Sequence, residues 1–351
     1  MNTLSIIKIL LPLITSFFIG LVIFPLIISF LTNLKMWKKK SVEKTIDGRE
    51  ATISSKLHND ENKSTPRSGG VGVIVSVLLC VLFLRLLPII DSNHFTLGVN
   101  MLSRSQTWMP IIALILAGLI GFIDDYAVTH DIGKYIGKGL DLKYRIIGVA
   151  ILGALSAYWL FFKNDISSLY LPILGNINIG YWFLLFAMFV YVFVYSGGVI
   201  DGVDGLSGGV FAVMFTSYGV VSIIHFQNDI AALCFSVAGA LLAFLWFNIP
   251  PAQVFLSESG TTGLTVLLAT VAFYTDAVWL LPIIALPLVI TSLSVIIQLI
   301  SKKFRNGKKV FLVAPIHHHF EALGYPKYNV AMKYWIFSFI CGLTGVVLAA
   351  I

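Results

Sequence analysis

Long apolar stretches separated by short polar ones dominate this 351-residue chain. Each stretch approaches the roughly 20 residues that an α-helix needs to cross the hydrocarbon core of a bilayer. The pattern predicts ten membrane-spanning helices in a single polytopic domain that covers residues 1–351. The predicted spans are 5–32, 70–90, 109–127, 145–162, 180–196, 208–225, 230–247, 261–276, 278–300 and 333–350. Only Thr275-Asp276 and Pro282 indicate the break between the eighth and the ninth span.

One short segment between the fourth and fifth predicted spans has a different pattern. Residues 170–180 alternate apolar and polar side chains around Gly175-Asn176, which is typical of a β-hairpin. The expected fold class is therefore an all-α integral membrane protein with about ten transmembrane helices and one small β-hairpin.

The positive charges follow the predicted topology. Threading the ten spans places the loops 33–69, 124–144, 197–207, 248–260 and 301–333 on one side. All but four of the 24 Lys and Arg residues lie in these loops or at their edges; the exceptions are Lys8, Arg85, Arg104 and Lys163. The positive-inside rule makes this side cytoplasmic and places both termini and the hairpin outside. The net charge of +7 therefore does not indicate nucleic acid as a partner, although some cations are candidates for contacts with anionic lipid or nucleotide phosphates.

Acidic side chains gather at the ends of apolar stretches on the same side. Asp124-Asp125 ends the third span, and Glu258 precedes the eighth. Ionisable groups at the hydrocarbon boundary are costly and mark functional sites by default. Adjacent carboxylates remain ionised most easily beside a divalent cation or a basic partner, and hard oxygen ligands favour Mg²⁺. The alternative is that these acids are solvated helix ends and N-caps.

A glycine-rich loop follows the fifth span and contains two further acids. Residues 196–209 hold six glycines together with Asp201 and Asp204. Glycine permits close backbone approach, so that exposed N–H groups can face an anion or a flat base. The alternative is a plain turn in which an aspartate caps the next helix.

Two basic segments complete the predicted cytoplasmic face. The last loop contains His317-His318-His319, and three consecutive histidines cannot all bind one metal from a helix, because ligand pairs use i, i+4 spacing. Donation to phosphate, or proton transfer near neutral pH, fits them better. Residues 63–70 place cations and hydroxyls before the second span, where a helix N-terminus can bind phosphate. The alternative for the three histidines is an incidental polar loop. The alternative for residues 63–70 is that their cations simply flank the second span on its positive, inner side.

These motifs together resemble the polyprenyl-phosphate N-acetylhexosamine-1-phosphate transferases, and among them the phospho-N-acetylmuramoyl-pentapeptide transferase branch. The resemblance covers nearly the whole chain. Its most specific segment is 314–321 (Ala-Pro-Ile-His-His-His-Phe-Glu), followed by 248–255 (Asn-Ile-Pro-Pro-Ala-Gln-Val-Phe). The segments 124–126 (Asp-Asp-Tyr) and 201–206 (Asp-Gly-Val-Asp-Gly-Leu) are shared by the wider superfamily.

The resemblance implies an enzyme of peptidoglycan synthesis in the bacterial cytoplasmic membrane, with its active site facing the cytoplasm and a homodimer as its assembly. It implies Mg²⁺-dependent transfer of phospho-MurNAc-pentapeptide from its UDP carrier to undecaprenyl phosphate, with release of UMP. The catalytic residues that it implies are Asp124, Asp125, Glu258, His317, His318 and His319. The substrate-binding residues are Lys63, Thr65, Asp201, Gly202, Asp204, Asn248 and Phe255, and the Mg²⁺ ligands are Glu258, Asp124 and Asp125. Among them, Asp125 is expected to deprotonate or orient the lipid phosphate.

The chain departs from the pattern of that family at four places. Arg67-Ser68 stands where the family has Thr-Met, and Gly197-Gly198 lies where it has asparagines. Glu258 stands where it has an aspartate, which keeps the charge but moves it by one methylene. The lysine that often follows Asp-Asp-Tyr is absent, and the candidate substitutes are Lys134, Lys138 and Lys143.

Three other functions remain open from the sequence. A sibling enzyme that uses UDP-GlcNAc or a related UDP-sugar is the nearest, and the His triplet with its flanks disfavours it. A secondary transporter would place its site near the bilayer midplane, whereas charged residues are almost absent from the centres of the predicted helices. A catalytically silent relative that binds lipid or nucleotide would explain the four departures.

Overall fold

The structure is a computed structural model that describes residues 3–37, 64–91, 94–103, 106–133, 138–172 and 174–351. The described residues are mostly helical, which confirms the predicted fold class. The helices are α1 (Thr3–Asn33), α3 (Gly70–Ile90), α4 (His94–Val99), α5 (Trp108–Thr129), α6 (Leu142–Lys163), α7 (Trp182–Ser196), α8 (Leu206–Ile224), α9 (Asn228–Asn248), α10 (Ser257–Tyr274), α11 (Leu281–Ile284), α12 (Leu286–Phe304), α13 (Ile316–Ala322) and α14 (Lys327–Ala349). Two short 3-10 helices are η1 (Gly197–Ile200) and η2 (Val278–Leu280).

Nine helices of the described residues are long and apolar enough to cross a membrane, against the ten predicted spans. The exception is α10, predicted as 261–276, because the helix begins at Ser257 and its first turns are rich in Ser, Thr and Glu. Almost every side chain of α10 is buried, and the helix packs against α5, α7 and α3. Its small polar side chains therefore face neighbouring helices and not lipid, as is common where membrane helices approach closely.

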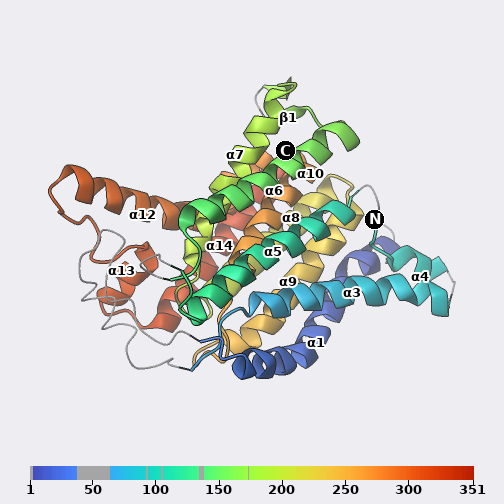
Figure 1. Cartoon of the computed structure of the whole chain (residues 1–351). Coiled ribbons are helices and arrows are strands. Elements are labelled where there is room, and N and C mark those ends of the chain that lie inside the picture. Colours follow the sequence, from blue (N-terminus) through green and yellow to red (C-terminus); the bar gives the residue numbers. More distant parts are fainter. Residues whose placement is uncertain (1–2, 38–63, 92–93, 104–105, 134–137, 173) are drawn as a thin grey trace.

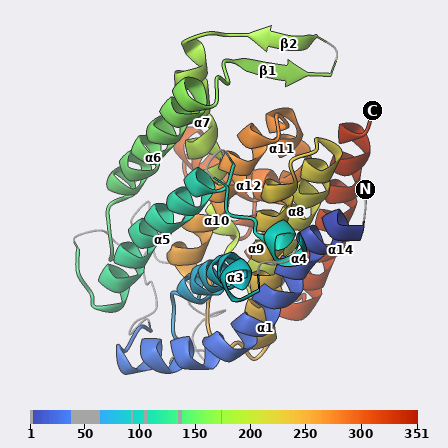
Figure 2. The ribbon, with the colours of Figure 1, turned by 90° about the vertical axis from the view of Figure 1, so that its right-hand side faces the viewer.

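The centre of the bundle is formed by α8, α9 and α10, which are the most buried helices. The outer helices surround them, with α1 and α3 on one side and α5, α6 and α7 on another (Figures 1 and 2). On α6 the exposed apolar side chains Ile147, Ile151 and Leu155 recur every four residues. One face of this helix therefore meets lipid while the other packs on α7.

The predicted ninth span, 278–300, is wrong as a single helix. The structure divides it into η2, α11 and α12, with a break at Ala285. Pro282 and Pro287 lie in the first turns of α11 and α12, where the missing N–H of proline is tolerated. Beyond the break, α12 projects from the bundle and α13 follows it (Figure 1). The predicted boundary at Thr275-Asp276 is confirmed, since α10 ends at Tyr274.

The predicted hairpin is present as β1 (Ser168–Leu171) and β2 (Gly175–Asn178). The strands are antiparallel, with Ser168 opposite Asn178 and Leu171 opposite Gly175. Gly175 therefore belongs to the second strand, and the turn lies just before it, not at Gly175-Asn176. The hairpin extends beyond the ends of α6 and α7 (Figure 2).

One end of the bundle collects the chemistry-bearing segments. Here α5, α7 and α9 end and α6, α8 and α10 begin, so their terminal residues are neighbours. The end of α1 also lies here, because the Arg67 N–H donates to the Met36 carbonyl oxygen at 2.6 Å. The start of α14 follows α13 at this end, and the first and last described residues therefore lie at the other end of the bundle.

Candidate active site

Asp125 is fully buried near the end of α5 and connects three segments. Its Oδ2 accepts hydrogen bonds from the Ser68 hydroxyl at 2.9 Å and from the Ser259 N–H at 3.0 Å. Its Oδ1 accepts from the Glu258 N–H at 3.3 Å and lies 3.6 Å from Nε of Arg67. Both oxygens are therefore engaged within the protein, and the carboxylate fixes the segment before α3 to the start of α10.

Asp124 and Glu258 share a single cation, the guanidinium of Arg145. Nη1 of Arg145 lies 3.2 Å from Oδ2 of Asp124 and 2.8 Å from Oε1 of Glu258. The other oxygen of Asp124 accepts the Leu140 N–H at 2.7 Å. Arg145 also hydrogen-bonds the hydroxyl of Tyr195, which is buried in the last turn of α7. Three helices, α5, α6 and α10, thus meet through two carboxylates and one guanidinium.

This convergence depends on close packing between α5 and α10. A Cβ added to Gly121 would lie 2.1 Å from the carbonyl oxygen of Glu258, which no side chain could occupy without moving α10. Glycine at this position therefore allows α5 to approach the first turn of α10. Gly121 lies three residues before Asp124 in α5. The close approach of α5 therefore also brings Asp124 and Asp125 to the first turn of α10.

The surroundings of Glu258 raise the pKa of its carboxyl group above the ordinary value. It lies in the first turn of α10, outside the candidate membrane spans, and 31% of its side chain remains exposed. Burial raises its pKa to about 7; the guanidinium of Arg145 lowers the pKa, and the carboxylates of Asp125 and Asp124 raise it. The neighbouring guanidinium of Arg145 thus favours the ionised form of Glu258 against the effect of burial.

We expect this raised pKa to make the stability of the metal-free protein depend on pH. The folded state holds the Glu258 proton more tightly than the unfolded chain, whose pKa is near the ordinary 4.5. The resulting stabilisation is present below that value and is lost as the pH rises through about 7. In EDTA, the Tm of the wild type should therefore fall relative to that of Glu258→Gln between about pH 5 and pH 8. Parallel curves for the two proteins would contradict the raised pKa.

The loop 201–205 is fixed by side chains from two other segments. Oδ1 of Asp201 accepts the Ser207 hydroxyl and Oδ2 accepts the Ser257 N–H, each at 2.7 Å. The buried side chain of Asn248 accepts the Gly205 N–H at 2.8 Å and donates to the Val254 carbonyl oxygen at 2.8 Å. Asp204, in the same loop, is also buried. Asp201 and Asn248 therefore shape the loop, together with the start of α10.

Two of the three predicted histidines meet this loop. A Cβ added to Gly202 would lie 2.7 Å from Nε2 of both His317 and His318, so the ring nitrogens reach the loop backbone. His318 is in turn paired through Nδ1 with Glu321. His319 is engaged elsewhere: its Nδ1 accepts the Leu312 N–H at 3.2 Å, in the segment that precedes α13. The structure thus brings His317 and His318 to the site and separates His319 from it.

The remaining predicted substrate residues lie between the segments 64–70 and 248–258. Phe255 is half-buried; its N–H donates to the Pro66 carbonyl oxygen at 3.0 Å, and its own carbonyl oxygen accepts the Gly69 N–H at 2.7 Å. The hydroxyl of Thr65 donates to the Ala252 carbonyl oxygen at 3.3 Å. Lys63 lies outside the described residues.

The sequence pointed to the cations of segment 63–70, which include Arg67, but it did not identify the cation that pairs with Asp124 and Glu258. Of the proposed substitute lysines, Lys134 lies outside the described residues, and Lys138 and Lys143 are exposed. The side chain of Lys143 lies over the Tyr144 ring. Arg145, two residues later, provides the charge, and Arg67 provides a second one. The available signal was an arginine at the first position of a predicted span, at the same end as Asp124.

The three clustered carboxylates fit only in part as ligands of a hard divalent cation. No group of three His, Cys, Asp or Glu side chains in the described ranges is arranged as a metal cage. Mg²⁺, however, usually binds one or two carboxylates together with waters and substrate phosphates. Asp124 and Glu258 already face the guanidinium of Arg145, and their carboxylates fit the role of Mg²⁺ ligands. Asp125 fits less well, because its oxygens are engaged by backbone N–H groups, Ser68 and Arg67.

The fold and the site define a multi-pass membrane protein with an acidic cluster, partly neutralised by arginine, at one end of its helix bundle. The profile of glycosyl transferase family 4 matches residues 107–276, which contain all three clustered carboxylates. Over 346 residues the chain is 32% identical to the phospho-N-acetylmuramoyl-pentapeptide-transferase of Geobacillus sp. (strain WCH70), with 96% of each chain covered.

Proteins of the same name from two other bacteria are similar to the chain. That of Listeria monocytogenes serovar 1/2a is 30% identical over 91% of both chains. That of Chloroflexus aurantiacus is 30% identical over 82% of this chain and 77% of its own. The chain belongs to the phospho-N-acetylmuramoyl-pentapeptide-transferase family, which confirms the resemblance found in its motifs.

Proposed function

We propose that this protein transfers phospho-MurNAc-pentapeptide from UDP-MurNAc-pentapeptide to undecaprenyl phosphate. An oxygen of the lipid phosphate attacks the phosphorus that carries the sugar, the bond between the two phosphates of the donor breaks, and UMP leaves. The observation that carries this proposal is the meeting of Asp124, Glu258 and Arg145 where α5, α6 and α10 reach one end of a membrane bundle. Family membership supports the identity of both substrates.

The residues of the cluster suit a reaction that depends on charge. Phosphoryl transfer is promoted mainly by positioning and by neutralising negative charge on the phosphate oxygens. Arg145 and Arg67 supply positive charge, and Asp125 holds Arg67 and the start of α10 in place. Asp124 and Glu258 would hold Mg²⁺, which when bound would neutralise charge on the diphosphate of the donor.

The loop 201–205 and its neighbours are proposed to bind the donor. By family likeness, Asp201, Gly202, Asp204 and Phe255 take the uridine end, and His317 and His318 contact the diphosphate or the sugar. The ring nitrogens of both histidines at the Gly202 backbone support this assignment. Asn248 acts by shaping the loop, since its amide is engaged with Gly205 and Val254.

We place the active site on the cytoplasmic side of the bacterial inner membrane. By family likeness, we propose a homodimer as the assembly. The bias of Lys and Arg toward the loops at the site end supports this orientation. A donor with a nucleotide and a peptide would arrive from water, and the acceptor phosphate would arrive along the bilayer. A site at the end of the bundle serves both.

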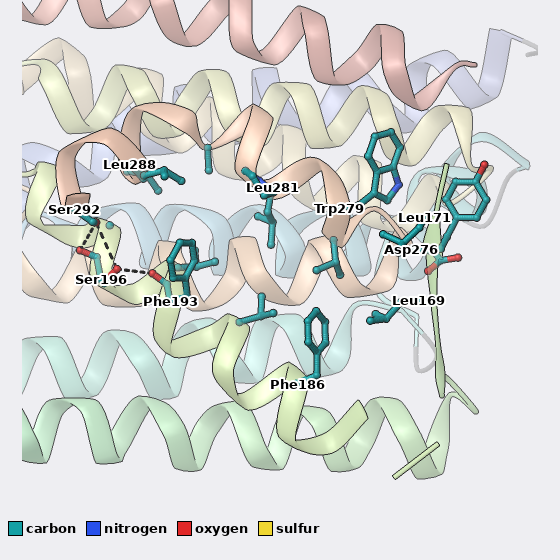
Figure 3. A pocket seen from close by; sticks show the side chains of 18 residues that line it. Leu169, Leu171, Phe186, Phe193, Ser196, Asp276, Trp279, Leu281, Leu288 and Ser292 are labelled. Atoms are coloured by element: carbon teal, nitrogen blue, oxygen red, sulfur yellow. Dashed lines mark hydrogen bonds between the residues drawn. The ribbon is translucent and has the colours of Figure 1, made fainter. Parts of the chain in front are cut away.

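An apolar cavity beside the site supports a lipid acceptor. The cavity measures about 240 Å³ and lies between α7 on one side and η2, α11 and α12 on the other. Figure 3 shows it extending from Ser196 and Ser292, where α7 ends next to the site, to Trp279 and Asp276 near the hairpin. The side chains between these two ends are apolar. We propose that part of the polyprenyl chain occupies this cavity, with its phosphate toward the carboxylate cluster.

Val190 is one of the residues that line this cavity, and Val190→Trp puts a larger side chain into the lining. We expect this change to raise the KM for the polyprenyl phosphate by roughly tenfold while the KM for the nucleotide donor stays unchanged. The matched control is Phe189→Trp, since the neighbouring side chain is 61% exposed on the outside of the bundle and should tolerate the change. Steady-state kinetics with either substrate varied measure both effects. An unchanged acceptor KM in Val190→Trp would exclude the cavity as the lipid site.

The proposed function is tested by UMP release from the detergent-purified protein. The assay contains UDP-MurNAc-pentapeptide and undecaprenyl phosphate with Mg²⁺ or EDTA, and UDP-GlcNAc serves as a competing donor. UMP that requires the muramoyl donor, the lipid and Mg²⁺ would support the proposal. Turnover with UDP-GlcNAc alone would identify a sibling transferase. No UMP from either donor, in folded protein, would leave a binding protein without this activity.

A further inference from the structure

Arg145 occupies the place between two carboxylates where a divalent cation would be expected. Its Nη1 is within 3.2 Å of Asp124 and 2.8 Å of Glu258, and only 16% of its side chain is exposed. The Tyr195 hydroxyl provides an additional hydrogen bond to the side chain. The guanidinium is thus fixed by groups from α5, α7 and α10.

A guanidinium and a divalent cation cannot share this position. Both would bind the same carboxylate oxygens, and the repulsion between positive charges at a few ångströms is large in a partly buried site. A metal ion therefore has to displace Arg145 from at least one carboxylate. The displaced guanidinium would then be close to the phosphates that accompany the metal, and its planar fork suits phosphate oxygens.

We infer that Arg145 acts as a built-in competitor of the metal: in the substrate-free protein it neutralises Asp124 and Glu258, and it turns to the phosphates when the nucleotide donor enters. This inference rests on the proposed function for the identity of the donor. It predicts weak metal binding to the protein alone. It also predicts that donor and metal strengthen each other's binding, because a ligand that draws Arg145 away from the carboxylates raises the affinity for the second ligand, and the effect is reciprocal.

Direct metal binding tests the inference without turnover. Mn²⁺, which shares the oxygen preference of Mg²⁺ and is paramagnetic, is titrated into the substrate-free full-length protein in detergent, and free Mn²⁺ is followed by electron paramagnetic resonance. The pH is held at about 8, well above the ordinary pKa of a carboxyl group. Arg145→Gln should bind Mn²⁺ roughly tenfold more tightly than the wild type. Arg145→Lys, which keeps the charge, should remain close to the wild type.

Two controls separate competition at the site from a general charge effect. Lys143→Gln removes the same charge from an exposed position two residues away, and it should not change the affinity. The double variant Arg145→Gln/Glu258→Gln should lose the gain, since the carboxylate that the metal would use is gone. An Arg145→Gln protein that binds Mn²⁺ no more tightly than the wild type would overturn the inference, as would an equal gain in Lys143→Gln.

A second pair of variants tests the same idea if Arg145→Gln does not fold. Tyr195→Phe removes one partner of Arg145 without changing any charge, and it should strengthen Mn²⁺ binding several-fold. Its control is Tyr191→Phe, one turn earlier in α7, where the buried hydroxyl contacts Thr270 at 2.8 Å and not the cluster. Equal affinities of the two variants would count against the inference. Because no donor is present, this result is independent of whether UMP is released.

Discussion

Glu258→Gln should lower the rate of UMP release by roughly 100- to 1,000-fold while the protein remains folded. The glutamine keeps the shape of the side chain but removes the charge that faces Arg145 at 2.8 Å and that would hold Mg²⁺ with Asp124. The loss should appear in kcat at saturating donor, since the cation that this charge would hold neutralises the reacting phosphates. Initial rates at several Mg²⁺ concentrations measure the effect, and added Mg²⁺ should not restore the wild-type rate.

Two further variants sharpen this experiment. Glu258→Asp restores the residue that the family has here but withdraws the carboxylate by one methylene, and its rate should lie between those of the wild type and Glu258→Gln. Asp229→Asn, a matched loss of an acid at the other end of the bundle, where Asp229 pairs with Lys8 at 2.6 Å, should leave the rate unchanged. A Glu258→Gln protein that retains most of its activity would remove Glu258 from the catalytic residues.

Helix positions and the clustering of acids at one end of the bundle followed from the sequence because both depend on local pattern. Apolar stretches of sufficient length predict spans, and their threading predicts which ends meet. That reasoning brought Asp124 and Glu258 to the same end although 134 positions separate them. That both carboxylates reach the same guanidinium could not be predicted, since it depends on α5 approaching α10 at Gly121.

The residues that the sequence reasoning missed are those whose role depends on orientation. Arg145 is the first residue of a predicted span, and the span pattern does not show which groups its side chain contacts. That contact depends on the structure, which places the start of α6 beside Asp124. His319 shares a motif with His317 and His318, yet successive residues of a helix point in different directions, and it binds its own loop. The break at Ala285 was missed because an apolar stretch interrupted by prolines still has the hydropathy of a single span.

Asp125→Asn should lower both the activity and the stability, because the structure assigns the carboxylate an anchoring role. The amide nitrogen brings N–H donors where the Ser259 N–H already donates at 3.0 Å, so at least one buried donor loses its acceptor. The cost is about 1–3 kcal/mol for an unsatisfied buried group. The segment of Arg67 and the start of α10 would then shift, and the activity should fall by roughly 100-fold through misplacement of Glu258.

The same variant separates this role from direct action on the lipid phosphate. A group that acted only as a base would leave the thermal unfolding of Asp125→Asn unchanged while turnover disappeared. An anchor instead predicts a lower Tm and weaker Mn²⁺ binding together with the loss of activity. Asp131→Asn, an exposed acid six residues further along, controls for the loss of one negative charge near the end of α5. A fully stable, inactive Asp125→Asn protein would show that Asp125 reaches the substrate in a conformation that frees its oxygens from Ser68 and Ser259.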